Sequence, residues 1–441
     1  MSSTGFKGGV HPGYHKEITA TMAVIAMKPP SKVVIPLQQH IGAPCEPLDN
    51  IEVGTHVKLG QKIADSSGFV SAPIHATVSG TITEIGLFNH PLGRPVQAIT
   101  IESDGQDEWD ETINPAGDLD DLSSDDIRKL VREAGIVGLG GATFPAHVKL
   151  SPPAEKPIDL VIINGAECEP YLTADHRVML EKPEEIVFGL KAILKALGAE
   201  KAVIGIEDNK SDAIRVMEQA ISGENNITVA RLHTKYPQGA EKMLINVTTG
   251  RKVPSGGLPL DIGVVNHNVG TAVAVAEAIR EGKPLIERVV TVTGSGVNRP
   301  SNLLIRIGTL VSDVLEVCGG LKETTQKLII GGPMMGLAQP DPDIPVIKGT
   351  SGILALTDQD IYIAESSPCI RCAKCIDACP VQLLPTEIAK LAENKLYKKA
   401  EKIYALDCFE CGCCSYVCPS KIPLTQWIRI AKAEILKAKK K

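Results

Sequence analysis

Two cysteine runs of identical spacing constrain this chain more than any other feature. The first run has the spacing C-x2-C-x2-C-x3-C-P and contains Cys369, Cys372, Cys375, Cys379 and Pro380. The second run repeats it with Cys408, Cys411, Cys414, Cys418 and Pro419. Nine of the 12 cysteines lie in this short stretch. Two such runs are typical of a ferredoxin-like module that holds two [4Fe–4S] clusters.

The spacing also predicts which cysteines share a cluster. A cubane has four iron corners, and three closely spaced thiolates from one loop can bind three of them. In this pattern the fourth cysteine of each run binds the other cluster. The first cluster would then take Cys369, Cys372, Cys375 and Cys418. The second would take Cys408, Cys411, Cys414 and Cys379, and Cys413 is expected to be a buried bystander.

Zinc and disulfides are the alternatives for so many cysteines. Structural zinc uses C-x2-C pairs separated by a longer loop and needs no third cysteine at this spacing. Disulfides suit short secreted chains, whereas this chain has 441 residues and no recognisable secretory signal. We therefore expect iron–sulfur clusters, one-electron transfer and a reducing compartment.

Bulk composition limits the remaining possibilities. The length predicts about three or four domains. The formal net charge of −6 argues against general nucleic-acid binding, which needs a basic surface. No run of about 18 apolar residues predicts a transmembrane helix. The histidines show no metal-binding spacing, and the basic tail, residues 433–441, is expected to be a solvated helix end rather than a lipid-binding segment.

The predicted fold class is a multidomain α/β protein. After an N-terminal segment, residues 1–28, a barrel-sandwich β domain is expected at residues 29–103. Its strand-like stretches are residues 33–37, 68–70, 80–85 and 96–101. The pattern resembles lipoyl and biotinyl carriers, but the expected hairpin tip, residues 65–68, has no lysine to modify. We therefore expect a structural, unmodified domain.

A linker and a helix, residues 104–135, precede the largest domain. Ser124 is expected to cap a helix at residues 125–134. In residues 136–285, apolar runs alternate with helical patterns, which predicts a Rossmann-like α/β domain with a largely parallel sheet. The strands are expected at 160–163, 202–206 and 227–232, and the helices at 183–197, 211–221, 240–247 and 272–280. Ligands bind such sheets at the carboxyl ends of the strands.

The C-terminal third predicts two further domains. Short strands and one helix at residues 286–355 indicate a β-grasp module, similar to SLBB domains. The two-cluster domain is expected at residues 356–432, with a helical pair at 386–393 and 396–405 between the cysteine runs.

A glycine loop and an acidic strand end are the candidate nucleotide site. Gly138, Gly140 and Gly141 precede a helical start at Pro145, and glycines let a backbone approach phosphate. Glu167 and Glu169 follow the strand expected at 160–163. Carboxylates there can bind ribose hydroxyls or a nicotinamide amide. An ordinary glycine turn and a solvated loop are the alternatives.

Four segments in the same order resemble the NADH-binding subunit of respiratory complex I. They are residues 138–150, residues 164–170, Gly239-Ala240-Glu241 and Asn268-Val269-Gly270-Thr271. The resemblance implies FMN held by the glycine loop (Gly138, Gly140, Gly141), Lys149, Asn164 and Asn268. It also implies NADH near Glu167, Glu169 and Glu241, with Phe144 available to stack. Ala166 and Ala240 depart from the family pattern, where acidic residues stand.

The order of all domains resembles the C subunits of Rnf electron-transport complexes. The opening residues 6–12, Phe-Lys-Gly-Gly-Val-His-Pro, are part of that resemblance. It implies a peripheral NAD(H)-side subunit at the cytoplasmic face of the prokaryotic cell membrane, beside integral-membrane and other Rnf subunits. There, electrons pass between NAD(H) and ferredoxin, and ions are moved. No side chain is expected to act as an acid or base in the hydride step, because the flavin accepts it.

Two rival functions share these features. One is a soluble flavin–iron–sulfur reductase, such as a cobalamin reductase. The other is a non-enzymatic scaffold that conducts electrons but binds no nucleotide.

Overall fold

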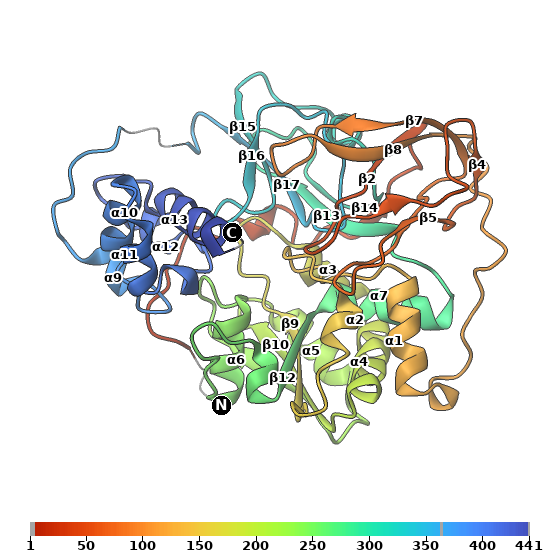
Figure 1. Cartoon of the computed structure of the whole chain (residues 1–441), viewed down its shortest axis with the longest axis horizontal. Helices are drawn as coiled ribbons and strands as arrows, with labels where there is room; N and C mark the ends of the chain where they lie inside the picture. Colours follow the sequence, from red (N-terminus) through yellow and green to blue (C-terminus); the bar gives the residue numbers. More distant parts are fainter. Residues whose placement is uncertain (1–4, 362–364, 440–441) are drawn as a thin grey trace.

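The computed structural model describes residues 5–361 and 365–439. Three domains form the body of the molecule, and the cysteine-rich domain lies to one side of it (Figure 1). Within the described residues, no helix is long and apolar enough to cross a membrane.

The barrel-sandwich domain is built from two facing antiparallel sheets. One has the order β2 (Lys32–Pro36), β8 (Val96–Ser103), β7 (Gly80–Phe88), β4 (His56–Val57), and the other β3 (Glu46–Pro47), β5 (Lys62–Asp65), β6 (Ile74–His75). Aliphatic side chains such as Val33, Ile63 and Ile99 fill the space between the sheets. The strand expected at residues 68–70 is wrong. This segment is an irregular loop, because it turns toward the next domain and the Phe69 carbonyl lies 3.1 Å from His147 Nε2.

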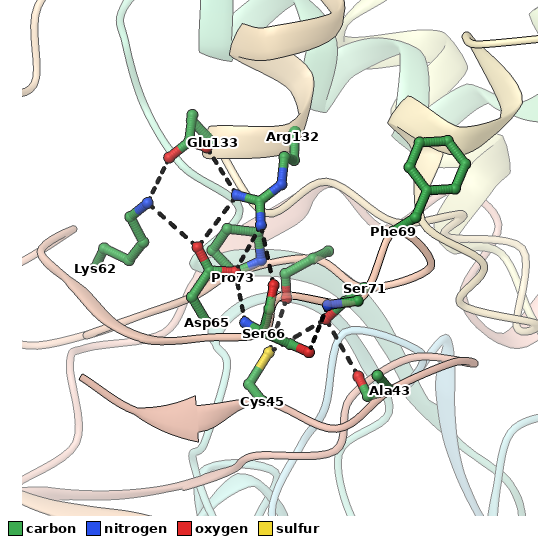
Figure 2. Close-up of polar contacts among 12 residues, drawn as sticks. Ala43, Cys45, Lys62, Asp65, Ser66, Phe69, Ser71, Pro73, Arg132 and Glu133 are labelled. Atoms are coloured by element: carbon green, nitrogen blue, oxygen red, sulfur yellow. Dashed lines mark hydrogen bonds and ion pairs between the residues drawn. The ribbon is translucent and has the colours of Figure 1, made fainter. Parts of the chain in front are cut away.

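The hairpin tip after β5 is fixed to a helix instead of projecting into solvent (Figure 2). Arg132 of α1 (Ser124–Glu133) donates to both carboxylate oxygens of Asp65, at 2.9 and 3.1 Å. Lys62 bridges Asp65 and Glu133. The cap of α1 is Ser123, not the predicted Ser124, because Ser123 and Asp126 form a reciprocal capping box.

The central domain has a four-stranded sheet whose strands are all parallel. The order is β11 (Ile227–Leu232), β10 (Lys201–Glu207), β9 (Leu160–Gly165), β12 (Val264–Asn268). α1, α4 (Pro183–Leu197), α5 (Ser211–Ala220) and α7 (Val269–Arg280) share the core on one face, and α6 (Glu241–Thr249) packs on the other. The Rossmann-like prediction is therefore confirmed.

One strand and one α-helix of this domain were not predicted. β12 ends in Asn266, His267 and Asn268, and this polar ending hides a strand whose residues are all buried. α3 (Ala174–Glu181) has a weak apolar pattern of its own. Both lie at the carboxyl edge of the sheet, where polar residues interrupt the apolar patterns that predict strands and helices.

A six-stranded mixed sheet forms the β-grasp-like domain. Its order is β1 (Val24–Ala26), β14 (Ser301–Arg306), β13 (Glu287–Thr293), β17 (Gly352–Thr357), β15 (Thr325–Ile330), β16 (Leu337–Gln339), with α8 (Val311–Val317) packed on it. β1 comes from the N-terminal segment, which is therefore not separate from this domain. β17 extends beyond the predicted boundary at residue 355.

Helices surround the cysteine runs in the last domain. They are α9 (Lys374–Asp377), α10 (Pro385–Glu393), α11 (Tyr397–Lys402), α12 (Cys413–Tyr416) and α13 (Leu424–Lys439). The predicted helical pair is present as α10 and α11, although α11 ends earlier than expected and a short 3-10 turn, Ala405–Asp407, follows it. The expected boundary at residue 432 is wrong, because α13 continues through it to Lys439, whose ammonium lies 2.7 Å from Glu401.

Candidate functional site

The carboxyl ends of β9 and β12 bring two predicted flavin residues side by side. Asn164 and Asn268 are register partners on these neighbouring parallel strands. The Asn268 side chain accepts from Gly270 N at 2.8 Å, which caps α7, and donates to Asp175 Oδ2 at 2.7 Å. Asn164 donates to the Gly239 carbonyl at 2.8 Å. Asparagine suits these positions because the chain turns after each strand, and an asparagine side chain can accept from the backbone N–H groups that are exposed at such a turn.

The glycine loop lies directly over this edge. Gly138 N donates to the Phe144 carbonyl at 2.8 Å, which closes the loop, and Leu139 N donates to Thr271 Oγ1 at 3.0 Å. A Cβ atom at Gly140 would lie only 3.6 Å from Asn268 Cβ. Gly141 has φ +101° and open space on its Cβ side. The loop therefore packs closely against the strand end at Gly140, whereas the open space beside Gly141 lets a ligand approach the backbone there.

Lys149 supplies a positive charge at the same edge. It belongs to the short α2 (Ala146–Lys149) and donates to Glu241 Oε1 at 2.8 Å and to the Asn266 carbonyl at 3.0 Å. Lys149 and Glu241 are 28% and 36% exposed, so a ligand can reach either. The structure thus brings together the glycine loop, Lys149, Asn164, Glu241 and Asn268.

Unpaired buried polar groups around this edge fit a flavin. Gln238 is fully buried, and among the described residues neither of its amide atoms has a hydrogen-bond partner. Asn266 Oδ1 is also buried and unpaired. Such groups are costly unless a partner is present. The isoalloxazine ring of FMN has N–H and C=O groups on one edge, and the ribityl chain attached to the ring ends in a phosphate, so FMN offers partners for donors and acceptors of this type.

Glu167 and Glu169 are engaged in a different way. Glu167 accepts from the backbone N–H groups of Asp175 and His176, at 2.7 and 3.1 Å, and so holds the start of α3. Glu169 accepts from Met334 N and Met335 N, at 3.0 and 2.9 Å, and so ties the strand end to the β-grasp-like domain. Burial raises the pKa of Glu169 to about 7. Neither carboxylate is among the residues that contact Lys149, and nucleotide contact by them stays a prediction.

Asp175 is a half-buried acid whose carboxylate accepts from Asn268. Burial, and then the neighbouring Glu167, raise its pKa to about 7. The same segment is held from the other side by Lys16, whose ammonium donates to the carbonyls of Glu167, Glu169 and Leu172 at 2.8, 2.9 and 2.5 Å. These contacts tie the segment after β9 to the N-terminal part of the chain.

The second predicted set of cluster ligands surrounds one cavity. Its lining includes Cys379, Cys408, Cys411 and Cys414. Cys379 is the crossed ligand predicted from the other run, so its presence here matches a cubane site. Burial raises the pKa of Cys408 to about 12 and that of Cys414 to about 11. Iron binding must therefore displace the protons, as thiolate ligation requires.

The first run has the same local geometry as the second. Arg371 N donates to Cys369 Sγ and Glu410 N donates to Cys408 Sγ, both at 3.4 Å. Threonines at equal spacing, Thr386 and Thr425, lie near Cys375 Sγ and Cys414 Sγ, at 2.8 and 3.7 Å. Residues of left-handed φ also recur at matching places, which are Arg371 and Glu410, Ala373 and Gly412, and Gln382 and Lys421. The two runs thus form an internal pair.

Cys413 corresponds to Lys374 in this pairing, since each is the first residue of its short helix. Cys413 is fully buried, whereas Lys374 and Cys372 are exposed. The second run is covered by the body of the molecule, in a cluster with Val10, Cys168 and Tyr236. Among the described residues, no three His, Cys, Asp or Glu side chains converge on one metal ion. Cubane ligands need not do so, because each binds a separate iron.

Comparison with known proteins gives four matching family models. They are the RnfC barrel sandwich hybrid domain at residues 4–106, the Nuo51 FMN-binding domain at 131–277, the SLBB domain at 289–338 and the 4Fe-4S dicluster domain at 368–422. The C subunit of the proton-translocating ferredoxin:NAD(+) oxidoreductase complex of Clostridium ljungdahlii is 52% identical, over 97% of this chain and 93% of that protein. The chain belongs to the RnfC family.

Other similar proteins agree with that assignment. The C subunit of the Na(+)-translocating ferredoxin:NAD(+) oxidoreductase complex of Acetobacterium woodii is 50% identical, over 99% of this chain and 98% of that protein. Among solved structures, an NAD+-reducing [NiFe]-hydrogenase in the H2-reduced state matches with a TM-score of 0.51 and 18% identity, over 73% of this chain and 65% of that one. That likeness concerns the fold alone.

Several residues of this RnfC-family site were not predicted from the sequence. Thr271 orients the glycine loop, and Asp175 orients Asn268. Arg288 reaches from β13 to the Leu139 carbonyl at 3.3 Å, and its Nε is buried without a partner in the part of the chain that the structure describes. Tyr236 lies fully buried between two domains. Thr271 belongs to a segment that the sequence had marked; the other three carry no local signal, because their partners are distant in the chain.

Proposed function

We propose that this chain is the NAD(H)-side subunit of an ion-translocating ferredoxin:NAD+ oxidoreductase. It exchanges hydride between NAD(H) and FMN and passes single electrons through two [4Fe–4S] clusters. One observation carries the proposal. The chain contains both the sheet edge proposed to bind the flavin and a cavity lined by the four predicted ligands of one cluster. The hydrogen bond from Tyr236 to the Cys411 carbonyl joins the two domains that carry them.

FMN, when bound, supplies the conversion of a two-electron hydride into single electrons. The chain's own residues bind and orient it. Gly138, Gly140 and Gly141 allow close approach of the backbone, and Lys149 offers charge for the phosphate. Asn164 and Asn268 hold the strand-edge side. Phe144 and Glu241 would then contact the nucleotide, with Glu167 and Glu169 as further candidates.

The burial of the two runs supports an order of electron transfer. The second cluster lies against the flavin domain, because Cys411 is buried and its carbonyl accepts from Tyr236 at 2.8 Å. The first cluster lies nearer the surface, where Cys372 and the neighbouring Ile370 are exposed. We therefore place the second cluster next to the flavin and the first at the exit toward another subunit.

The partners follow from this role. We propose that the chain docks on integral-membrane and other subunits of the complex, at the cytoplasmic face of the membrane, and exchanges electrons with ferredoxin through them. A soluble reductase that serves another acceptor, or a scaffold without nucleotide, would share the fold. Membrane fractions and co-purified subunits distinguish the first rival, and flavin content distinguishes the second.

An anaerobic titration with NADH tests the proposal. Ultraviolet–visible spectra should show flavin bleaching, and electron paramagnetic resonance should then show two reduced clusters. Absence of flavin, or zinc in place of iron, would overturn it.

A further inference from the structure

The N-terminal strap, residues 6–19, runs between the domains that carry the two proposed cofactor sites (Figure 1). Gly9 N donates to the Ala378 carbonyl at 2.9 Å, beside the crossed ligand Cys379. The next residue, Val10, exchanges two backbone hydrogen bonds with Tyr236, at 2.8 and 3.0 Å. The strap thus bridges the second cluster and the loop that precedes α6.

Two glycines make this passage possible. Gly8 and Gly9 have φ +82° and +77°. A Cβ at Gly8 would lie 2.7 Å from the Cys379 carbonyl oxygen, and a Cβ at Gly9 would lie 2.5 Å from the Tyr236 carbonyl oxygen. Both neighbours are backbone, so they cannot swing aside. Only glycine lets the strap fit between these two carbonyls.

The far end of the strap holds the strand end of the flavin domain. Lys16 is 8% exposed and donates to three carbonyls of residues 167–172. Thr19 Oγ1 lies 2.7 Å from Thr173 Oγ1, and the Thr19 carbonyl accepts from Asn302 of the β-grasp-like domain at 2.9 Å. The Lys16 ammonium therefore pairs with backbone carbonyls, and these hydrogen bonds fix the course of residues 167–172.

We infer that the strap fixes the separation between the flavin edge and the second cluster, with Gly8, Gly9 and Lys16 as positioning residues for the electron-transfer step. This inference rests on the proposed function. Transfer between bound groups depends on their fixed geometry, and small displacements are costly. The strap contacts both the flavin domain and the iron–sulfur domain, whereas the chain that connects these two domains covalently passes through the whole β-grasp-like domain.

The test compares Gly9→Ala with Gly5→Ala in the full chain with its cofactors. Gly5 has open space around its Cβ position and no left-handed φ, so it is a matched control. In rapid mixing with NADH, Gly9→Ala should reduce its flavin at the parental rate but its clusters about tenfold or more slowly. Gly5→Ala should match the parent in both steps.

A second readout does not depend on activity. Hydrogen exchange at residues 234–239 and 376–382 should rise in Gly9→Ala and stay parental in Gly5→Ala. Lys16→Met provides a second variant, which should raise exchange at residues 167–173. Parental exchange and parental cluster reduction in both Gly9→Ala and Lys16→Met, with iron and flavin retained, would overturn the inference. If the parent protein accepted no electrons from NADH, the proposed function would be refuted instead. The hydrogen-exchange measurement would still test whether the strap holds the two domains together.

Discussion

Tyr236 donates its phenolic hydrogen bond to the Cys411 carbonyl, 2.8 Å away, and this contact joins the flavin domain to the iron–sulfur domain. Tyr236 is fully buried, and Cys411 is also among the buried residues. Burial raises the pKa of Tyr236, and the phenol therefore stays a donor throughout the physiological range.

Removal of this hydroxyl should weaken the junction. Tyr236→Phe leaves a buried carbonyl without its donor and should cost about 1–3 kcal/mol of stability. Thermal unfolding of the cofactor-loaded chain measures the effect. Tyr14→Phe is the control, because the contact of the Tyr14 hydroxyl with His11 is exposed and long, at 3.4 Å. Equal midpoints for the two variants would contradict the prediction.

Iron content tests the assignment of the cluster ligands. Cys411→Ser should lose about half of the iron, since one of two cubanes loses a ligand. Cys413→Ser should keep nearly all of it, because Cys413 matches the exposed Lys374 of the first run and has no ligand slot. Loss of a cluster in Cys413→Ser would show that the predicted register is wrong.

Asp175 should make the stability of the flavin domain depend on pH. Its folded pKa of about 7 lies above the ordinary value of 3.8. The folded state therefore binds the proton more tightly, and its stabilising contribution is present at acid pH and lost as the pH rises to about 7. Asp175→Asn should flatten this slope and be more stable than the parent at pH 8, by about 1 kcal/mol or more. Parallel pH profiles for parent and variant would contradict the prediction.

Glu241 and Glu167 should respond differently to the same substitution. Glu241→Gln replaces the charged partner of Lys149 at the ligand-accessible edge by a neutral amide. It should raise the KM for NADH several-fold and leave flavin reduction at saturating NADH nearly unchanged, which stopped-flow absorbance measures.

Glu167→Gln should act on stability instead. The Glu167 carboxylate accepts two N–H bonds at the start of α3, and an amide can accept only one of them well. We expect about 1–2 kcal/mol of destabilisation, visible in thermal unfolding. If the variant unfolds like the parent and only NADH binding changes, Glu167 contacts nucleotide, as the family resemblance implied.

Many elements of the fold could be predicted because their signals are local. The apolar face and the N-terminal proline of α4 define it within its own residues, and its predicted bounds match those observed. β12 could not be predicted, because its polar end serves the site and its burial depends on β9 and α7. Likewise, the sequence of the hairpin tip did not indicate its ion-pair partner, since Arg132 lies far along the chain from Asp65.

The candidate site divides in the same way. Spacing indicated the cysteines, and the family resemblance indicated the glycine loop, Lys149, Asn164 and Asn268, because each lies in a short motif. The sequence could not reveal that the Glu167 and Glu169 carboxylates accept backbone N–H groups of α3 and of the β-grasp-like domain. That use depends on which distant backbone groups reach the carboxylates.

The sequence by itself determined the chemistry, because the spacing of the thiolates in a loop decides which kind of cluster that loop can bind. Only the tertiary structure decided the relation between the two redox sites. The need for glycine at positions 8 and 9 becomes visible only when the backbones of Cys379 and Tyr236 lie against Gly8 and Gly9. Contacts between residues so far apart in the chain form only once the domains have packed, and for that reason no local pattern encodes them.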